Sequence, residues 1–287
     1  MSNRAHRTAL FFVLAMSVTV PLSAQIDLSG QWAGRIHHDQ NERGLGPDLG
    51  DYSSLPINEA ARYRAQAYSA SLLTLPEWQC RPHPADYMAG RAGFNIRLTP
   101  EYDPQTQQII AWRHHVAWMA QDRIIWMDGR PHPPEDAAHT WQGFSTGKWE
   151  GNILTVTTTH LKTGFLRRNG VPRSSEATLT EHLFRHGDVL TVASILEDPV
   201  YLTEPLARSV SYIFDRNQQM APYPCETAEE VPRPAGEVPH YLPGTNPFLT
   251  EWATKHNLPL QAGEGGAEQM YPEYKKKVAS GSAKASR

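Results

Sequence analysis

This sequence has little cysteine, which occurs only twice in 287 residues, and it has no excess of basic over acidic residues. The 27 Lys and Arg stand against 30 Asp and Glu, which gives a formal net charge of −3 at pH 7. Proteins that recognise nucleic acid need a basic surface that neutralises phosphates. We therefore expect no nucleic-acid partner.

Long apolar runs are also missing, apart from one near the N-terminus. Arg4 and Arg7 precede an apolar stretch from Ala9 to Val20. The segment 21–24 that follows ends in Ala24, a small residue suited to cleavage. The stretch is too short to span a bilayer and is typical of a secretory signal peptide. The sequence predicts a signal peptide over residues 1–24 and a periplasmic or secreted protein with no integral membrane segment. An uncleaved N-terminal anchor is the alternative.

Export changes the interpretation of the two cysteines. In an oxidising compartment, Cys80 and Cys225 are most simply one disulfide, which would close a long loop. The alternative is a metal ligand or a reactive thiol, because Cys80 and His83 have the spacing of a ligand pair. No second pair of that kind supports it, and we expect no metal and no cofactor.

Aromatic residues are plentiful, with 8 Trp, 11 Tyr and 8 Phe, which is enough for a folded core. Between turn-rich stretches, apolar residues alternate with a period of two, which predicts about nine strands in an antiparallel meander. Closing such a sheet into a barrel removes its edges. The expected strands after the first are 94–102, 107–118, 117–120 with 123–128, 142–149, 153–160, 177–185, 189–197 and 206–214.

The predicted fold is mainly β: one lipocalin-like barrel domain over residues 25–261. One helix is expected near the N-terminus, from Ile57 to Leu73, and a disordered tail over residues 262–287. Gly30-Gln31-Trp32 is similar to the opening strand of lipocalin-like barrels, where the Trp closes one end under an Arg from the last strand. Arg208, at the start of the last expected strand, is a candidate for this Arg.

Several motifs occur together in a fixed order and carry a resemblance. They are Trp78-Gln79-Cys80-Arg81-Pro82-His83, the Gly129-Arg130-Pro131-His132-Pro133 run, and the Trp141, Gly143, Ser145, Gly147, Trp149-Glu150-Gly151 pattern. Across roughly residues 75–226 the chain resembles a widespread group of exported bacterial proteins, common in soil and aromatic-degrading bacteria. The resemblance implies an exported, lipocalin-like fold and no particular reaction.

Strand parity places an ionisable side chain on the packed face of one hairpin. If Gly187-Asp188 is a two-residue turn, Glu181 lies opposite Ser194 and shares a face with Leu179 and Leu183. A carboxyl group among leucines should have a raised pKa, because burial disfavours its charge. Glu181 is therefore a candidate acid or base.

The preceding hairpin gives a second candidate by the same argument. Its more apolar face holds Trp141, Trp149 and, near its end, His160. An imidazole beside a carboxyl group in a dry cavity is suited to general acid–base chemistry. Together with His114, these groups could also form a two-His-one-carboxylate metal set, although no HxH or HxxxH spacing supports it.

Other candidates follow from weaker patterns. If Gln121-Asp122 forms a two-residue turn, His115 and Asp128 face each other as a His–carboxylate dyad. Arg208 is expected to neutralise Glu181 or to stack on Trp32.

The barrel is expected to hold one small hydrophobic or aromatic ligand. The expected ligand-binding residues are Trp118, Trp126, Trp141, Trp149, Ser194 and Arg208. One hypothesis is a cofactor-independent lyase or isomerase that uses Glu181 and His160. The alternatives are a periplasmic carrier without chemistry and a purely structural polar network.

Overall fold

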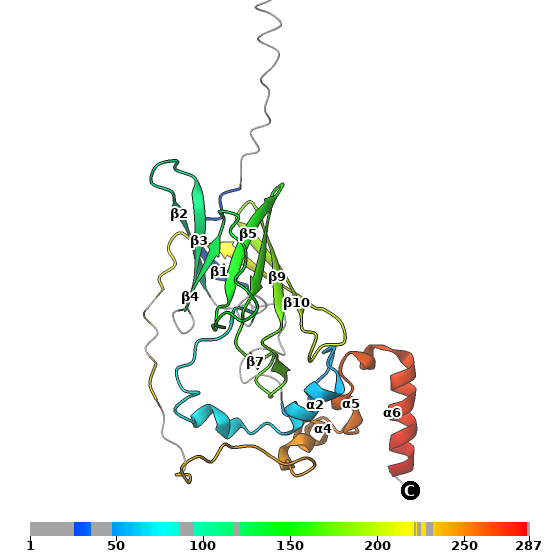
Figure 1. Ribbon diagram of the computed structural model, residues 1–287. Helices are drawn as coiled ribbons and strands as arrows, with labels where there is room; N and C mark the ends of the chain where they lie inside the picture. Colours follow the sequence, from blue (N-terminus) through cyan, green and yellow to red (C-terminus); the bar gives the residue numbers. More distant parts are fainter. Residues whose placement is uncertain are drawn as a thin grey trace, which may run out of the picture.

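The computed structural model describes residues 26–35, 48–86, 95–117, 121–220, 222, 225–227 and 232–285. The predicted signal peptide and Trp118 lie outside these residues. Nine strands close into a barrel in the order β1-β11-β10-β9-β6-β5-β4-β3-β2 (Figure 1). Their bounds are β1 Gly30–Gly34, β2 Ile96–Tyr102, β3 Ile109–Val116, β4 Gln121–Trp126, β5 Phe144–Glu150, β6 Ile153–Thr159, β9 Thr178–His186, β10 Val189–Glu197 and β11 Leu206–Phe214.

One pair of strands departs from the expected meander. β4 and β5 are parallel and pair only at Ile125 with Ser145 and at Trp126 with Thr146. The chain leaves β4 at Trp126 and returns through the Pro-rich segment 127–143, so that β5 begins beside the last residues of β4. The prediction of a wholly antiparallel sheet is wrong here, because alternation within a strand carries no information on the direction of its neighbour.

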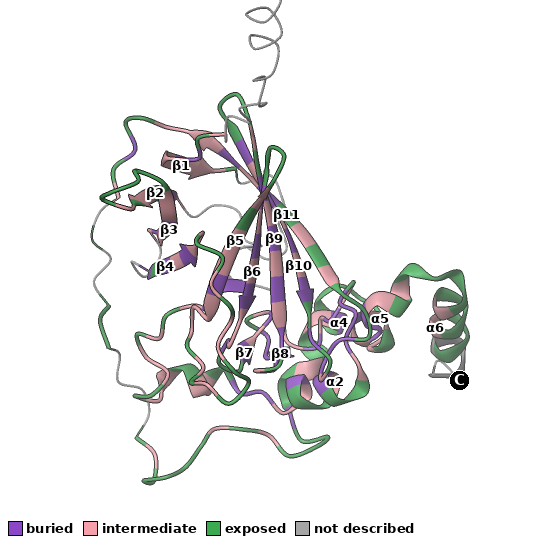
Figure 2. Cartoon of the chain, turned by 45° about the horizontal axis from the view of Figure 1, so that its top comes forward, coloured by how far each residue is buried: buried purple, intermediate pink, exposed green. Residues whose placement is uncertain are grey.

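The hairpin between β9 and β10 has the predicted register. Glu181 pairs with Ser194, and Leu183 with Val192. Gly187 has a φ of 58°, a left-handed conformation that favours glycine in tight hairpin turns. Buried residues alternate along both strands, as Figure 2 shows by colour. The predicted packed face of this hairpin is confirmed.

The barrel interior is filled by side chains rather than left open. Trp32 is fully buried near one end, and its ring contacts Phe214 edge-on with centroids 5.2 Å apart. Arg185 of β9 lies over Trp32, with its guanidinium carbon 5.1 Å from the ring centroid. The expected cation over Trp32 is therefore present, but it is Arg185 and not Arg208. The buried core consists of Leu28, Trp32, Ile96, Leu98, Trp112, Val116, Ile125, Leu154, Val156, Leu183, Leu190, Val192, Val210 and Tyr212.

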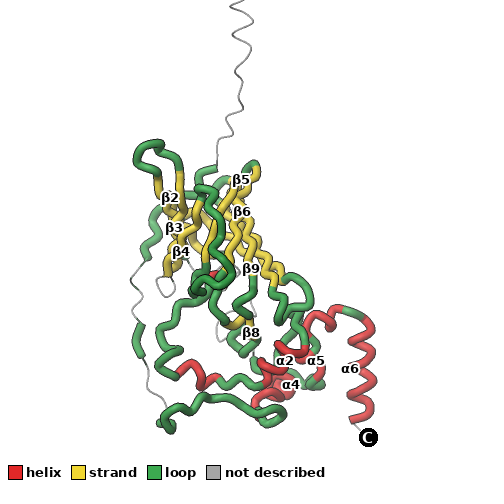
Figure 3. Tube along the Cα trace, in the orientation of Figure 1, coloured by secondary structure: helices red, strands yellow, loops and turns green. Residues whose placement is uncertain are grey.

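A second core lies below the barrel, where loops and short helices gather (Figure 3). It includes Ile57, Leu161, Leu179 and Leu196, so the lower ends of the strands contribute to it. The elements of this region are α2 Glu59–Gln66, η2 Ala70–Thr74, β7 Gly164–Phe165, β8 Pro172–Arg173, η4 Pro247–Thr250, α4 Glu251–Lys255, α5 Gln261–Glu264, η5 Gly266–Met270 and α6 Pro272–Ala285.

The helices correct two expectations. The predicted helix over 57–73 is divided into α2 and η2, because Tyr68 between them forms a β-bridge with His240. Most helices lie in the C-terminal part, and residues 262–285, for which we expected disorder, form helical segments of which α6 stands apart at the side in Figure 1. Within the described residues, no helix has the length and apolar character that a membrane span requires.

Candidate functional site

Three ionisable side chains meet inside the barrel. Arg123 Nη1 donates to Glu181 Oε2 at 2.5 Å, and Nη2 donates to Oε1 at 3.1 Å. Arg123 Nη2 also lies 3.0 Å from His114 Nδ1. Arg123 and Glu181 are each at most 2% exposed. The predicted inward position of Glu181 is correct, and its carboxylate forms a bidentate ion pair with Arg123.

The histidine of this trio is held neutral. A guanidinium can only donate, so His114 Nδ1 accepts the hydrogen bond and the ring proton resides on Nε2. Burial and the charge of Arg123 lower the pKa of His114 well below its ordinary value. A buried imidazolium beside a guanidinium would be doubly unfavourable, so the trio carries one positive and one negative charge.

Arg123 was not among the predicted partners of Glu181. Arg123 lies on the buried face of β4 together with Gln121 and Ile125, and this period-two pattern was the available signal. A turn predicted at 121–122 removes Gln121 from the strand, so the pattern was not recognised. In the structure β4 begins at Gln121, which pairs with Val116, and His115 faces Asp122 rather than Asp128.

The other half of the predicted dyad lies on the surface. Asp128 forms an ion pair with Arg130, whose guanidinium carbon is 3.5 Å above the Trp126 ring. His115 Nδ1 is 3.0 Å from Asp122 Oδ1. The predicted His115–Asp128 dyad is therefore wrong, and Trp126 is covered by a cation outside the barrel.

His160 lies away from Glu181. It follows the last residue of β6 and has a φ of 57°. This left-handed conformation ends the alternation of the strand, so the parity argument no longer applies to its side chain. His160 Nε2 is 2.9 Å from the Pro134 carbonyl oxygen, and Nδ1 is 2.7 Å from Thr159 Oγ1. His160 is only partly buried and contacts the Pro134 carbonyl in an exposed position, so the predicted placement of His160 on the packed face is wrong.

The remaining barrel candidates do not converge on an open site. Ser194 pairs with both Glu181 and Arg208 across neighbouring strands, and its hydroxyl lies 3.5 Å from the Arg208 carbonyl oxygen. Trp149 is half-buried and packs against the barrel core. Glu181 is neutralised by Arg123, so the expected role of Arg208 as its counter-ion is not observed.

Trp149 lines an open pocket of about 980 Å³ on the barrel, and another open pocket, of about 320 Å³, lies below the barrel. We call the pocket below the barrel the aromatic pocket. Trp78 and Phe165 stack with centroids 5.4 Å apart, and Tyr68 meets Phe165 edge-on at 5.3 Å. Trp141, predicted as a ligand-binding residue of the barrel, lines this pocket because it precedes β5. The described lining consists of Tyr68, Leu73, Trp78, Arg81, Pro82, His83, Pro84, Trp141, Gly164, Phe165, Arg167 and Arg168.

Several local features fix the pocket walls. Gly170 has a φ of 87°, and a Cβ there would come within 2.2 Å of Tyr68 Cβ, so glycine allows the chain to pack against this ring. Burial raises the pKa of Tyr68 to about 12, against a smaller opposing effect of Arg168. The Tyr68 hydroxyl therefore stays protonated, and this wall of the pocket is uncharged.

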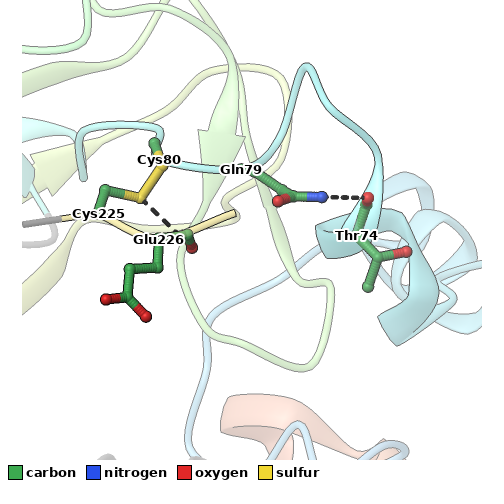
Figure 4. Close-up of a disulfide and its surroundings, with 5 residues drawn as sticks. All are labelled: Thr74, Gln79, Cys80, Cys225 and Glu226. Atoms are coloured by element: carbon green, nitrogen blue, oxygen red, sulfur yellow. Dashed lines mark hydrogen bonds between the residues drawn. A yellow bond between two sulfur atoms is a disulfide. The ribbon is translucent and has the colours of Figure 1, made fainter. Parts of the chain in front are cut away.

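The predicted disulfide anchors the loop that carries Trp78 and Arg81. Cys80 and Cys225 are joined with their Cα atoms 5.6 Å apart (Figure 4). Beside it, Gln79 Nε2 donates to the Thr74 carbonyl oxygen at 2.6 Å. Both thiols are consumed in the bond, which fits an oxidising compartment and leaves no thiolate as a ligand. The described residues contain no group of three or more His, Cys, Asp or Glu that could hold a metal ion.

The loop from Trp78 to His83 was recognised as a motif in the sequence. No pattern in the sequence predicted that this loop lies near Trp141 and Phe165. Their meeting depends on loops and on the disulfide, for which no periodicity exists. Comparison with known proteins adds no further constraint: no family model, curated protein or solved structure matches this chain.

Proposed function

We propose that this protein is an exported, lipocalin-like binding protein that holds a hydrophobic or aromatic small molecule in the aromatic pocket. The supporting observation is the convergence of Tyr68, Trp78, Trp141 and Phe165 around a space of about 320 Å³. Small-molecule sites are typically concave and lined by aromatic side chains with a few polar groups. The volume is suited to a ligand of one or two fused rings.

The geometry favours a carrier over acid–base catalysis in the barrel. Both carboxylate oxygens of Glu181 accept hydrogen bonds from Arg123, and the side chain is only 1% exposed. A general acid or base must reach the proton that it transfers. His160, the proposed partner, is engaged by Pro134 and Thr159 elsewhere.

The proposal is tested by isothermal titration of the full chain with 2-naphthol, a neutral two-ring probe. Trp141→Leu should weaken binding about tenfold, because it removes one aromatic wall of the pocket. Trp126→Leu is the matched control, since Trp126 is also a half-buried Trp beside an Arg but lies on the outside of the barrel. Absence of binding to the unmodified protein, or equal effects of the two substitutions, would overturn the proposal.

A further inference from the structure

We infer that the ligand of the aromatic pocket is anionic, an aromatic carboxylate whose charged group is bound by Arg81. This inference rests on the proposed function and narrows its ligand class. It depends on three features: the engagement of Arg81, the charges around the pocket, and the cations that already cover its indole rings.

Arg81 is held in place by aromatic rings instead of by an acid. Its guanidinium carbon lies 3.9 Å from the Trp78 ring centroid and 5.1 Å from that of Trp141. Its Nε donates to the carbonyl oxygen of Glu77. That bond uses one of five N–H donors. The Glu77 carboxylate acts on Arg81 only electrostatically, and no ion pair of the described residues includes Arg81. The two Nη groups form the planar fork that binds a carboxylate with two parallel hydrogen bonds.

Further basic side chains line the pocket around Arg81. Arg167, Arg168 and His83 also line it, and the described lining includes no Asp or Glu. Arg167 is positioned by donating from Nη1 to the Ser53 carbonyl oxygen at 3.2 Å. Because the walls are largely apolar, the attraction between these cations and an anion is less screened than in water.

The indole rings of the pocket already contact cations, so the pocket disfavours a cationic ligand. Aromatic cages bind quaternary ammonium groups through the faces of their rings. Here Arg81 lies over Trp78, and Lys162 Nζ lies 5.5 Å from the centroid of Trp141. A cationic ligand would meet like charges at both indoles. An aromatic body packed against the rings, with an anionic group at Arg81, satisfies both the apolar and the charged parts of the pocket.

The test is titration calorimetry of the full chain with two probes of the same shape, 2-naphthoate and 2-naphthamide. The unmodified protein should bind the carboxylate at least tenfold more tightly, and added NaCl should reduce this preference. Arg81→Gln should abolish the preference while binding of the amide remains, and Arg81→Lys should retain part of it. Arg113→Gln, which alters an exposed Arg paired with Glu101 on the barrel, should change neither affinity.

Each failure has a distinct meaning. Equal affinity for the two probes, or tighter binding of 2-naphthyltrimethylammonium, would overturn the anionic ligand and leave the aromatic pocket as a binding site. Binding of neither probe would overturn the proposed function itself. If Arg81→Gln lost both ligands, the preference of the unmodified protein and its salt dependence would decide.

Discussion

The barrel interior and the aromatic pocket each contain a key arginine, and these two arginines differ in whether a carboxylate pairs with them. Arg123 is buried, and both of its Nη groups donate to the Glu181 carboxylate. Arg81 is in contact with two indole rings, and no ion pair of the described residues includes it. A charge that is matched within the fold stabilises or specifies the structure, whereas one left unmatched in a pocket is available to a ligand.

The two regions also differ in how they are built. The barrel interior is made by paired strands whose alternating residues fill the space. The aromatic pocket is made by loops that a disulfide joins to the distant residue Cys225. Binding residues are common on loops held by a rigid scaffold. The comparison therefore predicts that changes in one region affect stability and that changes in the other affect binding.

The largest stability effect is expected from Glu181→Gln. This change leaves the buried charge of Arg123 unpaired, which should lower the free energy of unfolding by about 3–5 kcal/mol. Urea denaturation measures the loss, while the affinity for 2-naphthol well below the transition should stay unchanged. The double variant Glu181→Leu with Arg123→Met should recover much of the stability. A loss below 1 kcal/mol, as expected for an exposed pair such as Arg113–Glu101, would contradict this assignment.

A somewhat smaller effect is expected from removing the disulfide. Cys80→Ser with Cys225→Ser opens a loop with a sequence separation of 145 residues. Loss of such a cross-link should lower the unfolding free energy by about 2–4 kcal/mol. Because Cys80 lies next to Arg81, affinity for 2-naphthoate should also fall, which calorimetry would show. Unchanged affinity in the folded double variant would mean that the pocket does not depend on this anchor.

The smallest effect concerns His114 and pH. Burial and Arg123 lower the pKa of His114 in the folded state, so acid protonates the unfolded chain first. Stability should therefore fall as the pH drops below about 6.5, by up to about 1.4 kcal/mol per pH unit for this group. His114→Asn should make that dependence shallower in urea titrations between pH 7 and 5. The exposed His186→Asn serves as the control, and equal slopes for both variants would contradict the account.

The sequence allowed the barrel to be predicted better than the site. Alternation identified β10 and β11 at their observed bounds and the register of Glu181 with Ser194, because one face of each strand is buried. It failed where the backbone leaves the strand conformation, as at His160, and where a turn was misplaced, as at Gln121-Asp122. One-residue errors reverse every face assignment beyond them.

The aromatic pocket could be anticipated only in part. The disulfide followed from the two cysteines and the expected compartment, and Trp141 was selected for its aromatic character. The contacts of Arg81 with Trp78 and Trp141, and the stack of Trp78 on Phe165, join segments far apart in the chain. Loop contacts of this kind have no repeating pattern that a single sequence would reveal.

The most direct test of the central claim is a crystal structure of the full chain grown with 2-naphthoate. We expect the naphthalene to lie against Trp78, Trp141 and Phe165, with its carboxylate on the guanidinium of Arg81. We also expect that the Arg123–Glu181 pair remains intact and that no ligand lies in the barrel interior. Ligand bound inside the barrel against Glu181, with the aromatic pocket empty, would contradict the account.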